Sequence, residues 1–512
     1  MSVDSYTKEV PVEVSEMISK EALQVIQTAK ADAAAQYLVE FDGKFEPLTP
    51  KEEKWAIMKC DLCLIPVLFF TATMGAVDKV SLGTAAIFGF RTDTNLVGQQ
   101  YSWLSSIIFI GSLVGMWPMS YLVQRFRLGK VLAICSMLWS TFCLLLCACH
   151  SFPGLAALRF LMGFVESAIV PGCSLMISVF YLKTESPHRT AIVFVFASSV
   201  INGALSSLAS VFGNQIPTWK YIFILVGSVS FVWSCFVLWF LPDSPLNARF
   251  LNDREKYFMV RRVAANSTGV ENKEWKWYQV KEAFLDIRVY IVMLFNFGIN
   301  IPNGGLSTFS SIIIKNLGFT SVESSLMGMP TGVIASLSTV FFTWWGSRWV
   351  NRRCFVSILS LIVPLVGAVV VYAVDRSNVA GQLVGLYMMY FYFASYVVII
   401  SLVQANTAGN TKKSVTYSFN YLGYCGGAVT GSQTFRANQA PKYTGGFISM
   451  IVAYCVCILL CVVYWLICVY LNKKKELADD NEATTALGLE GLEDEQLLDL
   501  TDMEQKHFRY IT

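Results

Sequence analysis

Long apolar runs recur along most of the chain and are separated by short polar segments. Each run is near the roughly 20 residues that a helix needs to cross a bilayer. Lipid admits only helices and closed barrels, and runs this long and continuously apolar are helices. We place twelve transmembrane helices in two sets of six, at 62–88, 101–124, 130–150, 153–181, 189–213 and 219–241, and at 288–312, 322–347, 354–374, 380–404, 414–435 and 446–471.

The spacing of these runs predicts an all-α membrane protein with two six-helix bundles. Six spans, a polar linker and six further spans are typical of two halves related by a repeat. Basic residues follow the second span of each half, which gives the repeat weak support from the sequence. We assign four of them to gating loops: Arg125, Lys130, Arg348 and Arg352. The predicted segments are a polar arm at 1–60, a bundle at 61–241, a linker at 242–286, a bundle at 287–471 and an acidic tail at 472–512.

Composition agrees with this pattern and excludes several classes of protein. Only 15% of residues are charged and 54% are hydrophobic, whereas soluble proteins carry about 25% charged residues. The net charge of +3 is too small to suggest a nucleic-acid partner. Most of the 14 cysteines lie inside apolar runs, so we expect no metal site and no structural disulfide. We also expect no cofactor and no enzymatic activity, because no nucleophile–base pair and no phosphate-binding loop stand out.

The distribution of lysine and arginine predicts the orientation. Short loops that collect basic residues face the cytosol, and the richer side here also holds the linker, the arm and the tail. Both termini are therefore expected in the cytosol. Thr49 and Pro50 resemble a helix start before the first span, the arm lacks the apolar core of a signal peptide, and we expect the acidic tail to be disordered.

Four ionisable residues lie well inside the first and fourth spans. They are Asp78, Lys79, Arg159 and Glu166, and such groups are costly in lipid unless they face a protein interior or a water-filled path. Asp78 lies about 16 residues into the first span and Arg159 about six residues into the fourth, so both reach a similar depth in the outer half, with Glu166 deeper. Lys79 and Arg159 could hold an anion, while Asp78 and Glu166 could each carry a proton. The alternatives are that Asp78–Arg159 or Glu166–Arg159 are structural ion pairs, and that Lys79 extends to the outer surface.

The second half offers amides and aromatic side chains instead of charges within its spans. The run 300–305 contains a proline and two glycines and is expected to break the seventh span, freeing backbone groups for a substrate. The alternative for any single amide is a hydrogen bond to a neighbouring helix. Four glycines of the eleventh span indicate close helix packing or a hinge. The amides proposed for substrate binding are Asn300, Asn303, Asn406 and Asn420.

Several motifs in this order resemble one family of transporters. They are Asp78-Lys79, the basic loop 125–130, Arg159-x-x-x-Gly163-x-x-Glu166 with Pro171-Gly172, 219–223, 241–245 with 248–250, 406–413, and 433–435 with 440–443. The chain, from about 52 to 471, is similar to the major facilitator superfamily and, within it, to the anion:cation symporters of the fungal allantoate permease family. Gln124 departs from the family pattern, because an acid usually stands before the basic residues of that loop.

The resemblance implies alternating access about a central cavity and proton-coupled import of a small organic anion across the plasma membrane. It assigns anion and proton binding to Asp78, Lys79, Arg159 and Glu166. The family's substrates include allantoate, nicotinate and sulfonates, and the sequence does not select among them. We expect a monomer whose partners are the anion, protons and the lipid bilayer. A proton-independent facilitator or exchanger, and a nutrient receptor that does not transport, remain alternatives.

Overall fold

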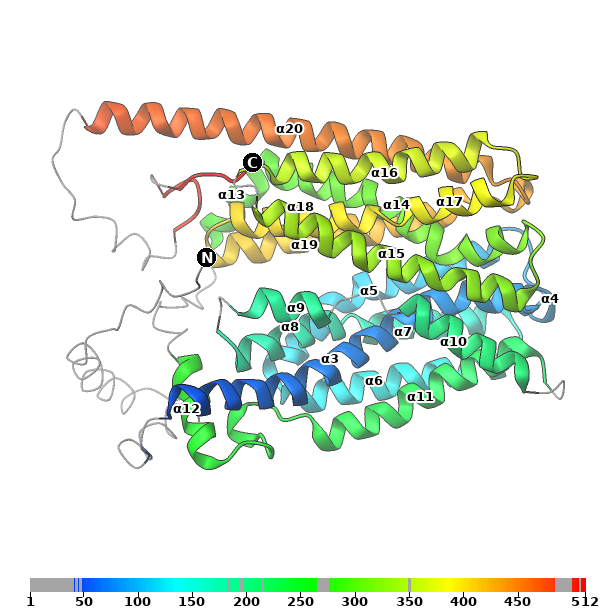
Figure 1. Ribbon diagram of the computed structural model, residues 1–512, viewed down its shortest axis with the longest axis horizontal. Coiled ribbons are helices and arrows are strands. Elements are labelled where there is room, and N and C mark those ends of the chain that lie inside the picture. Colours follow the sequence, from blue (N-terminus) through cyan, green and yellow to red (C-terminus); the bar gives the residue numbers. More distant parts are fainter. Residues whose placement is uncertain are drawn as a thin grey trace.

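The computed structural model describes residues 41, 45, 48–182, 185–193, 198–212, 216–264, 276–348, 351–483, 500–505 and 508–512. The described chain is helical, in two bundles that lie side by side (Figure 1). The first bundle comprises α3 (Pro50–Ile87), α4 (Phe90–Asp93), α5 (Gln100–Arg125), α6 (Leu128–Leu145), α7 (Phe152–Glu166), α8 (Ile169–Phe180), α9 (Ser186–Val193), α10 (Ser198–Val211) and α11 (Thr218–Phe240). The short helices α12 (Asp253–Ala264) and α13 (Trp277–Leu285) lie in the linker. The second bundle comprises α14 (Ile287–Lys315), α15 (Ser321–Arg348), α16 (Arg353–Ala373), α17 (Val379–Met389), α18 (Tyr392–Asn406), α19 (Asn410–Thr434) and α20 (Thr444–Ala483).

Ten of the described helical segments are long and apolar enough to cross a membrane. The predicted eleventh span is also present as α19, but its asparagines, serines and tyrosines make it too polar to meet that criterion. The fifth predicted span corresponds to α9 and α10, which flank residues 194–197 outside the described part. The apolar pattern therefore located the helices of both bundles.

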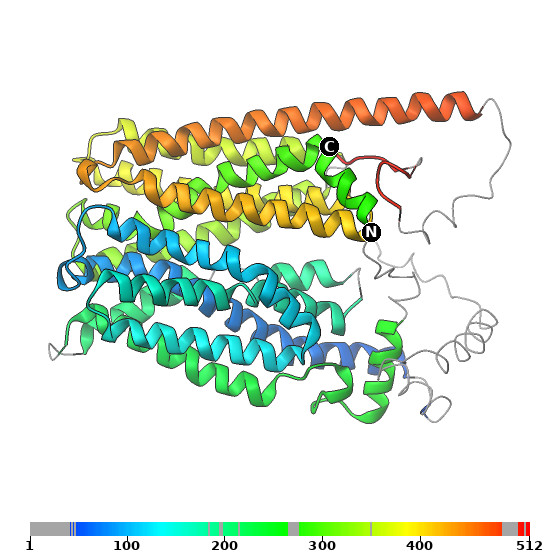
Figure 2. The same cartoon turned by 180° about the vertical axis from the view of Figure 1, so that it is seen from behind.

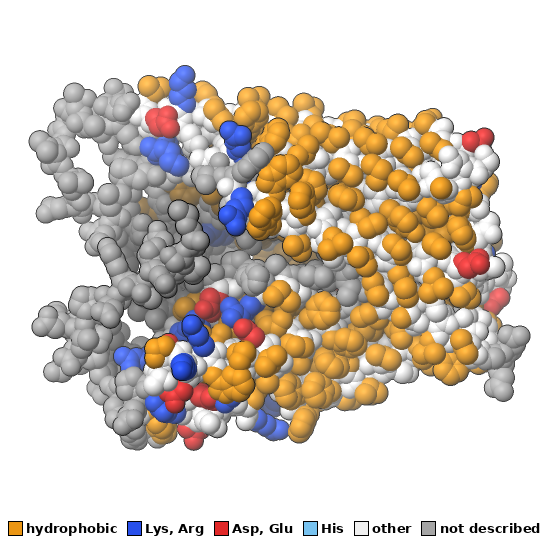
Figure 3. Space-filling view, in the orientation of Figure 1, with side chains coloured by type: hydrophobic (Ala, Val, Ile, Leu, Met, Phe, Trp, Pro, Cys, Tyr) orange, Lys and Arg blue, Asp and Glu red, His pale blue; other side chains and the backbone are white. Residues whose placement is uncertain are grey.

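The outer surface is that of a membrane protein. Large apolar side chains such as Trp117, Val232 and Leu337 are more than three-fifths exposed, which suits contact with lipid rather than water. Figure 3 shows apolar side chains over the middle of one face, with lysine and arginine gathered at the end that carries α12 and α13. We call this end the linker end and the opposite end the far end.

Helix starts and packing follow from local sequence. Thr49 caps α3, with its side chain accepting from Glu52 N and the Glu52 side chain accepting in return, and Pro50 stands at the first position as predicted.

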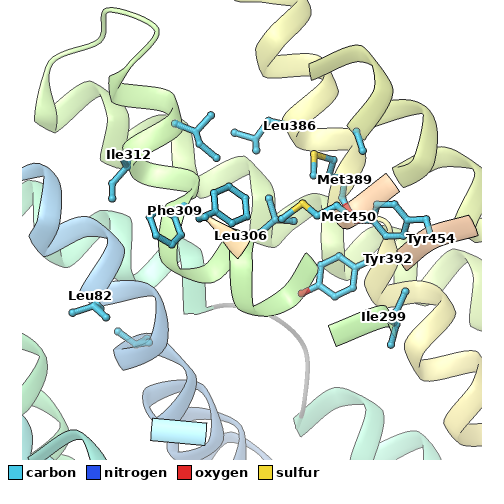
Figure 4. Packing of buried hydrophobic residues seen from close by; sticks show 14 of the residues in the cluster. Leu82, Ile299, Leu306, Phe309, Ile312, Leu386, Met389, Tyr392, Met450 and Tyr454 are labelled. Atoms are coloured by element: carbon cyan, nitrogen blue, oxygen red, sulfur yellow. The ribbon is translucent and has the colours of Figure 1, made fainter. Parts of the chain in front are cut away.

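In the second bundle, Met450 and Tyr454 of α20 pack toward Leu306 and Met389 (Figure 4). This core joins α14, α17 and α20 into one unit.

The predicted break in the seventh span is wrong. α14 is continuous from Ile287 to Lys315, with Pro302 inside it. The glycines instead allow two helices to touch: a Cβ on Gly304 would lie 2.0 Å from Ala428 O, and one on Gly427 would lie 2.1 Å from Phe297 O. The glycines of α19 thus provide close packing against α14.

The predicted disorder of the tail is also wrong for its described last part. Residues 500–505 and 508–512 lie against the linker end of the second bundle, beneath the long projecting end of α20 (Figures 1 and 2). Asp502 is fully buried and pairs with Arg288 and Lys412. Acidic composition alone could not reveal that Asp502 pairs with two buried cations.

Candidate functional site

Asp78 and Arg159 form a buried ion pair inside the first bundle. Arg159 Nη1 donates to Asp78 Oδ2 at 2.7 Å, and the two side chains are 2% and 0% exposed. The sequence placed these residues at a similar depth, and the structure brings them together. Because a buried charge needs a partner, this pair connects α3 to α7 without presenting a free charge.

Lys79 and Glu166 form the second pair, which is more accessible. Lys79 Nζ lies 2.8 Å from Glu166 Oε1, and the side chains are 22% and 11% exposed. Consecutive residues on a helix project about 100° apart, so Asp78 and Lys79 reach different partners. The alternative that Lys79 extends to the outer surface is wrong, because its ammonium group meets Glu166.

Two sequence features position Glu166. Gly163 lets α7 approach α5 so closely that a Cβ there would lie 1.9 Å from Ile108 O. Pro171 cannot donate to the carbonyl of Ser167, and the helix is interrupted after Glu166 before α8 begins at Ile169. Glu166 therefore ends one helical segment, and its Oε2 is buried with no hydrogen-bond partner among the described residues.

Aromatic side chains from both bundles surround Lys79. Its ammonium lies 5.5 Å from the centre of the Phe109 ring on α5. Tyr421 and Tyr424 of α19 stack with ring centres 5.7 Å apart, and Tyr424 packs edge-on against Phe109 at 5.9 Å. Both tyrosines are close enough to interact with the charge of Lys79. The second pair thus faces the other bundle, a feature that the spacing of aromatic residues in α19 could have indicated.

The amides of the second bundle form a connected chain of hydrogen bonds. Asn296 Nδ2 donates to Asn420 Oδ1 at 2.9 Å, and Asn303 Nδ2 donates to Asn300 Oδ1 at 3.0 Å. Asn300 Nδ2 joins the two pairs by donating to Asn296 O at 2.8 Å. Tyr392 donates to Asn303 Oδ1 at 3.0 Å. Asn420 Nδ2 is buried and has no partner among the described residues. Three of the four predicted amides therefore belong to one network, and Asn420 lies next to Tyr421 with a free donor.

Asn406 does not belong to that network, and its predicted role in substrate binding is not supported. It lies at the linker end of α18, where its Nδ2 donates to Ile511 O at 2.8 Å and its Oδ1 accepts from Ile511 N at 2.7 Å. It also bonds to the hydroxyl of Tyr464. These partners satisfy the amide and attach the end of the chain to the bundle.

The four basic residues predicted for the gating loops lie at the linker end, apart from the two buried pairs. Arg125, Lys130, Arg348 and Arg352 are exposed, and Arg348 stacks over Trp344 with a distance of 5.5 Å to the ring centre. The loop after α5 is held by a different contact, from Gly129 N to Asp243 Oδ1 at 3.0 Å. Asp243 thus links the start of α6 to the segment after α11.

The described hydrogen bonds between the bundles lie toward the far end. Tyr101 donates to Thr308 O at 2.9 Å, Lys315 Nζ donates to Ile87 O, and Gln433 Nε2 donates to Ser106 at 2.9 Å. Toward the linker end the helices of the two bundles diverge (Figure 1). The far end is therefore closed, and Lys79 and Glu166 lie on the inner side of that closure.

Comparisons with known proteins agree with this architecture. The family model of the Major Facilitator Superfamily matches residues 67–432. The chain is 36% identical over 493 residues to the MFS-type transporter cnsL of Penicillium expansum, covering 96% of this chain and 95% of that protein. It is 31% identical to the allantoate permease of Saccharomyces cerevisiae, covering 97% of this chain and 93% of that protein.

A solved structure supports the fold alone. The proton:xylose symporter XylE bound to 6-bromo-6-deoxy-D-glucose is similar with a TM-score of 0.59 and 14% identity, covering 78% of this chain and 95% of that one. Two bundles of membrane-crossing helices are thus a shared architecture.

Proposed function

Because the chain belongs to the major facilitator superfamily and is a multi-pass membrane transporter, we propose that it imports a small organic anion together with a proton. The observation that carries this proposal is the partly exposed pair of Lys79 and Glu166, 2.8 Å apart and facing the other bundle. A lysine can bind an anionic substrate, and a carboxyl group beside it can take up a proton. The name of the related allantoate permease supports an anion as substrate.

The proposed mechanism is an exchange of partners at Lys79. In the structure Glu166 neutralises Lys79. When Glu166 takes up a proton, it loses its charge and Lys79 becomes free to bind the substrate carboxylate. Asn420, whose Nδ2 is free among the described residues, can donate to a second polar atom of the substrate from the opposite bundle. The pair of Asp78 and Arg159 stays intact and holds α3 against α7.

The structure fits one state of an alternating-access cycle. The bundles are joined at the far end and diverge at the linker end, which is an inward-facing arrangement when the linker lies in the cytosol. Lysine and arginine at the linker end favour that orientation. We place the protein in the plasma membrane with both termini in the cytosol, as the family resemblance suggests.

The first test is a search for the ligand. Purified protein is heated with allantoate, nicotinate, ureidosuccinate or a sulfonate at about pH 5.5 and about pH 7.5, and a ligand at 100 times its Kd stabilises the protein by about 2.7 kcal/mol. We expect a ligand whose stabilisation is larger at the lower pH. Stabilisation that does not depend on pH would favour proton-independent exchange instead.

The second test uses variants in proteoliposomes with the ligand so found. Glu166→Gln should abolish accumulation driven by a proton gradient but keep exchange of labelled for unlabelled substrate, because glutamine mimics the protonated carboxyl group. Lys79→Gln should abolish both activities, whereas Lys442→Gln, an exposed lysine at the far end, should change neither. Proton-driven accumulation that survives in Glu166→Gln would refute the assignment of the proton to this residue.

A further inference from the structure

A small cavity lies inside the first bundle, separate from the face between the bundles. It is lined by residues of α3, α6, α8 and α11, and about 10 Å³ is accessible to the centre of a water-sized sphere. That volume is close to what one buried water molecule requires. The lining residues are Thr71, Met74, Gly75, Ser136, Trp139, Ile169, Ser230, Trp233 and Ser234.

The polar atoms around this cavity are those that a water molecule would satisfy. Ser136 Oγ, Trp139 Nε1 and Ser230 Oγ are buried and have no hydrogen-bond partner among the described residues. The three side chains are 5%, 1% and 2% exposed. Two hydroxyl groups and one indole N–H supply the three partners that a buried water usually has. An apolar void would stay dry, whereas three unsatisfied polar atoms in one small cavity favour a bound water.

The neighbouring hydroxyl groups already have partners. Thr71 Oγ1 donates to Val67 O at 2.8 Å and accepts from Trp233 Nε1 at 3.0 Å. Ser234 Oγ donates to Ser230 O at 2.7 Å. The unsatisfied side of the cavity is therefore confined to Ser136, Trp139 and Ser230.

Only a glycine separates this cavity from Glu166. Gly75 lines the cavity, and a Cβ built on it would lie 3.9 Å from Glu166 Cγ and 4.0 Å from Glu166 Oε1. Gly75 thus lines the cavity and leaves a space the size of a methyl group beside Glu166, which we call the opening at Gly75. Glu166 Oε2 is itself buried and without a partner among the described residues.

We propose that this cavity binds one water molecule, which hydrates the Glu166 carboxylate through the opening at Gly75 and so helps to set the pH at which Glu166 takes up its proton. The binding of water rests on the cavity alone, and its effect on Glu166 deepens the proposed proton coupling. A water that donates a hydrogen bond to a carboxylate stabilises the charged form. The other ionisable groups around Glu166 are Asp78 and Lys79 on α3, Arg159 on α7, and Tyr421, Tyr424 and Cys425 on α19.

The first experiment detects the water without a substrate. Brief X-ray radiolysis of the full-length protein in lipid nanodiscs generates hydroxyl radicals from bound water, and mass spectrometry locates the oxidised side chains. Trp139 should be oxidised many times faster than Trp219, which is equally buried but donates its Nε1–H to Asp93. Equal oxidation of Trp139 and Trp219 would overturn the water site.

Three variants separate the binding of water from its effect on Glu166. Ser230→Val fills the cavity and should lower the oxidation of Trp139 to the level of Trp219. Gly75→Ala places a methyl group in ordinary contact with Glu166 and 3.3 Å from Ile169 Cδ1, so it should close the opening and leave the oxidation of Trp139 unchanged. Ser234→Ala is the matched control, because it removes a cavity hydroxyl that already has a partner.

The second readout is the protonation of Glu166 itself, followed by infrared difference spectroscopy against Glu166→Gln as pH is varied. Both Ser230→Val and Gly75→Ala should raise the midpoint of protonation by about one to two pH units, the effect of losing one hydrogen bond to a charged group. Ser234→Ala should leave it unchanged. An unchanged midpoint in Gly75→Ala, which should fold normally, would overturn hydration of Glu166. Absence of any titrating carboxyl signal from Glu166 would instead refute the proposed proton coupling and leave the water site standing.

Discussion

Asp502 is the residue whose replacement tests most directly how the end of the chain is held. Its Oδ1 lies 2.8 Å from Lys412 Nζ, and its Oδ2 accepts from Arg288 Nη2 and from Tyr510 at 2.9 Å. Residues 508–512 are further bonded through Tyr510 N and Ile511 N. We predict that Asp502→Ala releases this segment while the bundles stay folded, because Arg288 keeps Asp286 as a partner and Lys412 keeps Glu282.

The size of the effect of Asp502→Ala depends on how well Arg288 and Lys412 remain paired. Removing one partner of a buried ion pair costs about 3–5 kcal/mol when the other charge is left uncompensated. Here Arg288 keeps Asp286 at 2.6 Å, and Lys412 keeps Glu282 at 2.8 Å and Asp286 at 3.1 Å. We therefore expect the low end of the range, about 3 kcal/mol in the free energy of opening the segment, or about a hundredfold faster exchange of its protected amides.

The assay is hydrogen–deuterium exchange with mass spectrometry on a peptide containing Tyr510 and Ile511. Met503→Ala is the matched control, because its side chain is 45% exposed beside Asp502. Exchange in Asp502→Ala that stays within about twofold of the control would refute the reasoning, since such a change corresponds to less than about 0.5 kcal/mol.

The same ion cluster predicts a dependence on pH. Burial acts to raise the pKa of Asp502, but Arg288 and Lys412 outweigh it and hold the pKa below its ordinary value. A lowered folded pKa contributes stability that is complete above the unfolded value of about 3.9 and is lost as the pH falls through the folded value. The segment should therefore stay attached at about pH 5 and be released only in stronger acid, and Asp502→Asn should remove this dependence.

Three further changes test the packing and the closure at the far end. Gly163→Ala places a Cβ 1.9 Å from Ile108 O, so we expect a loss of about 1–3 kcal/mol measured as a lower Tm; an unchanged Tm would show that α7 can move away from α5. Tyr101→Phe removes the bond to Thr308 O and should shift the population toward the outward-open state by about two- to tenfold. Distances between spin labels on the two bundles would measure that shift, and an unchanged distribution would contradict the role of this contact. Thr49→Ala removes the cap of α3 and should speed amide exchange in its first turn by about fivefold, for a loss of about 1 kcal/mol.

Much of the fold could be predicted from the apolar pattern, because a helix that crosses a bilayer needs a run of roughly 20 apolar residues. The depth argument also placed Asp78 and Arg159 together, since each residue advances a helix by a fixed rise. The partner of Lys79 could not be predicted in the same way. It depends on how α3 and α7 are rotated, and that rotation is fixed by contacts such as the approach of Gly163 to Ile108 O.

The position of the last described residues could not be predicted, for a different reason. Acidic residues in a polar tail usually favour disorder, and nothing local distinguishes Asp502 from its acidic neighbours. Its position depends on Arg288 and Lys412, which belong to helices far away in the sequence and are buried themselves. The contact of Asn406 could not be predicted for the same reason, because its partner Ile511 lies in that segment.

The two ion pairs of the first bundle explain why transport and protonation would be coupled under the proposed function. An unpaired charge is costly wherever water is excluded, so the transporter can change conformation only when Lys79 is neutralised. Two states meet this condition: the empty protein with ionised Glu166, and the loaded protein with protonated Glu166 and the substrate anion on Lys79. An anion bound beside ionised Glu166 would leave one negative charge in excess, and protonated Glu166 without an anion would leave one positive charge. Under the same proposal the pair of Asp78 and Arg159 stays neutral throughout, which leaves Lys79 and Glu166 as the residues whose charge balance decides when the bundles can move.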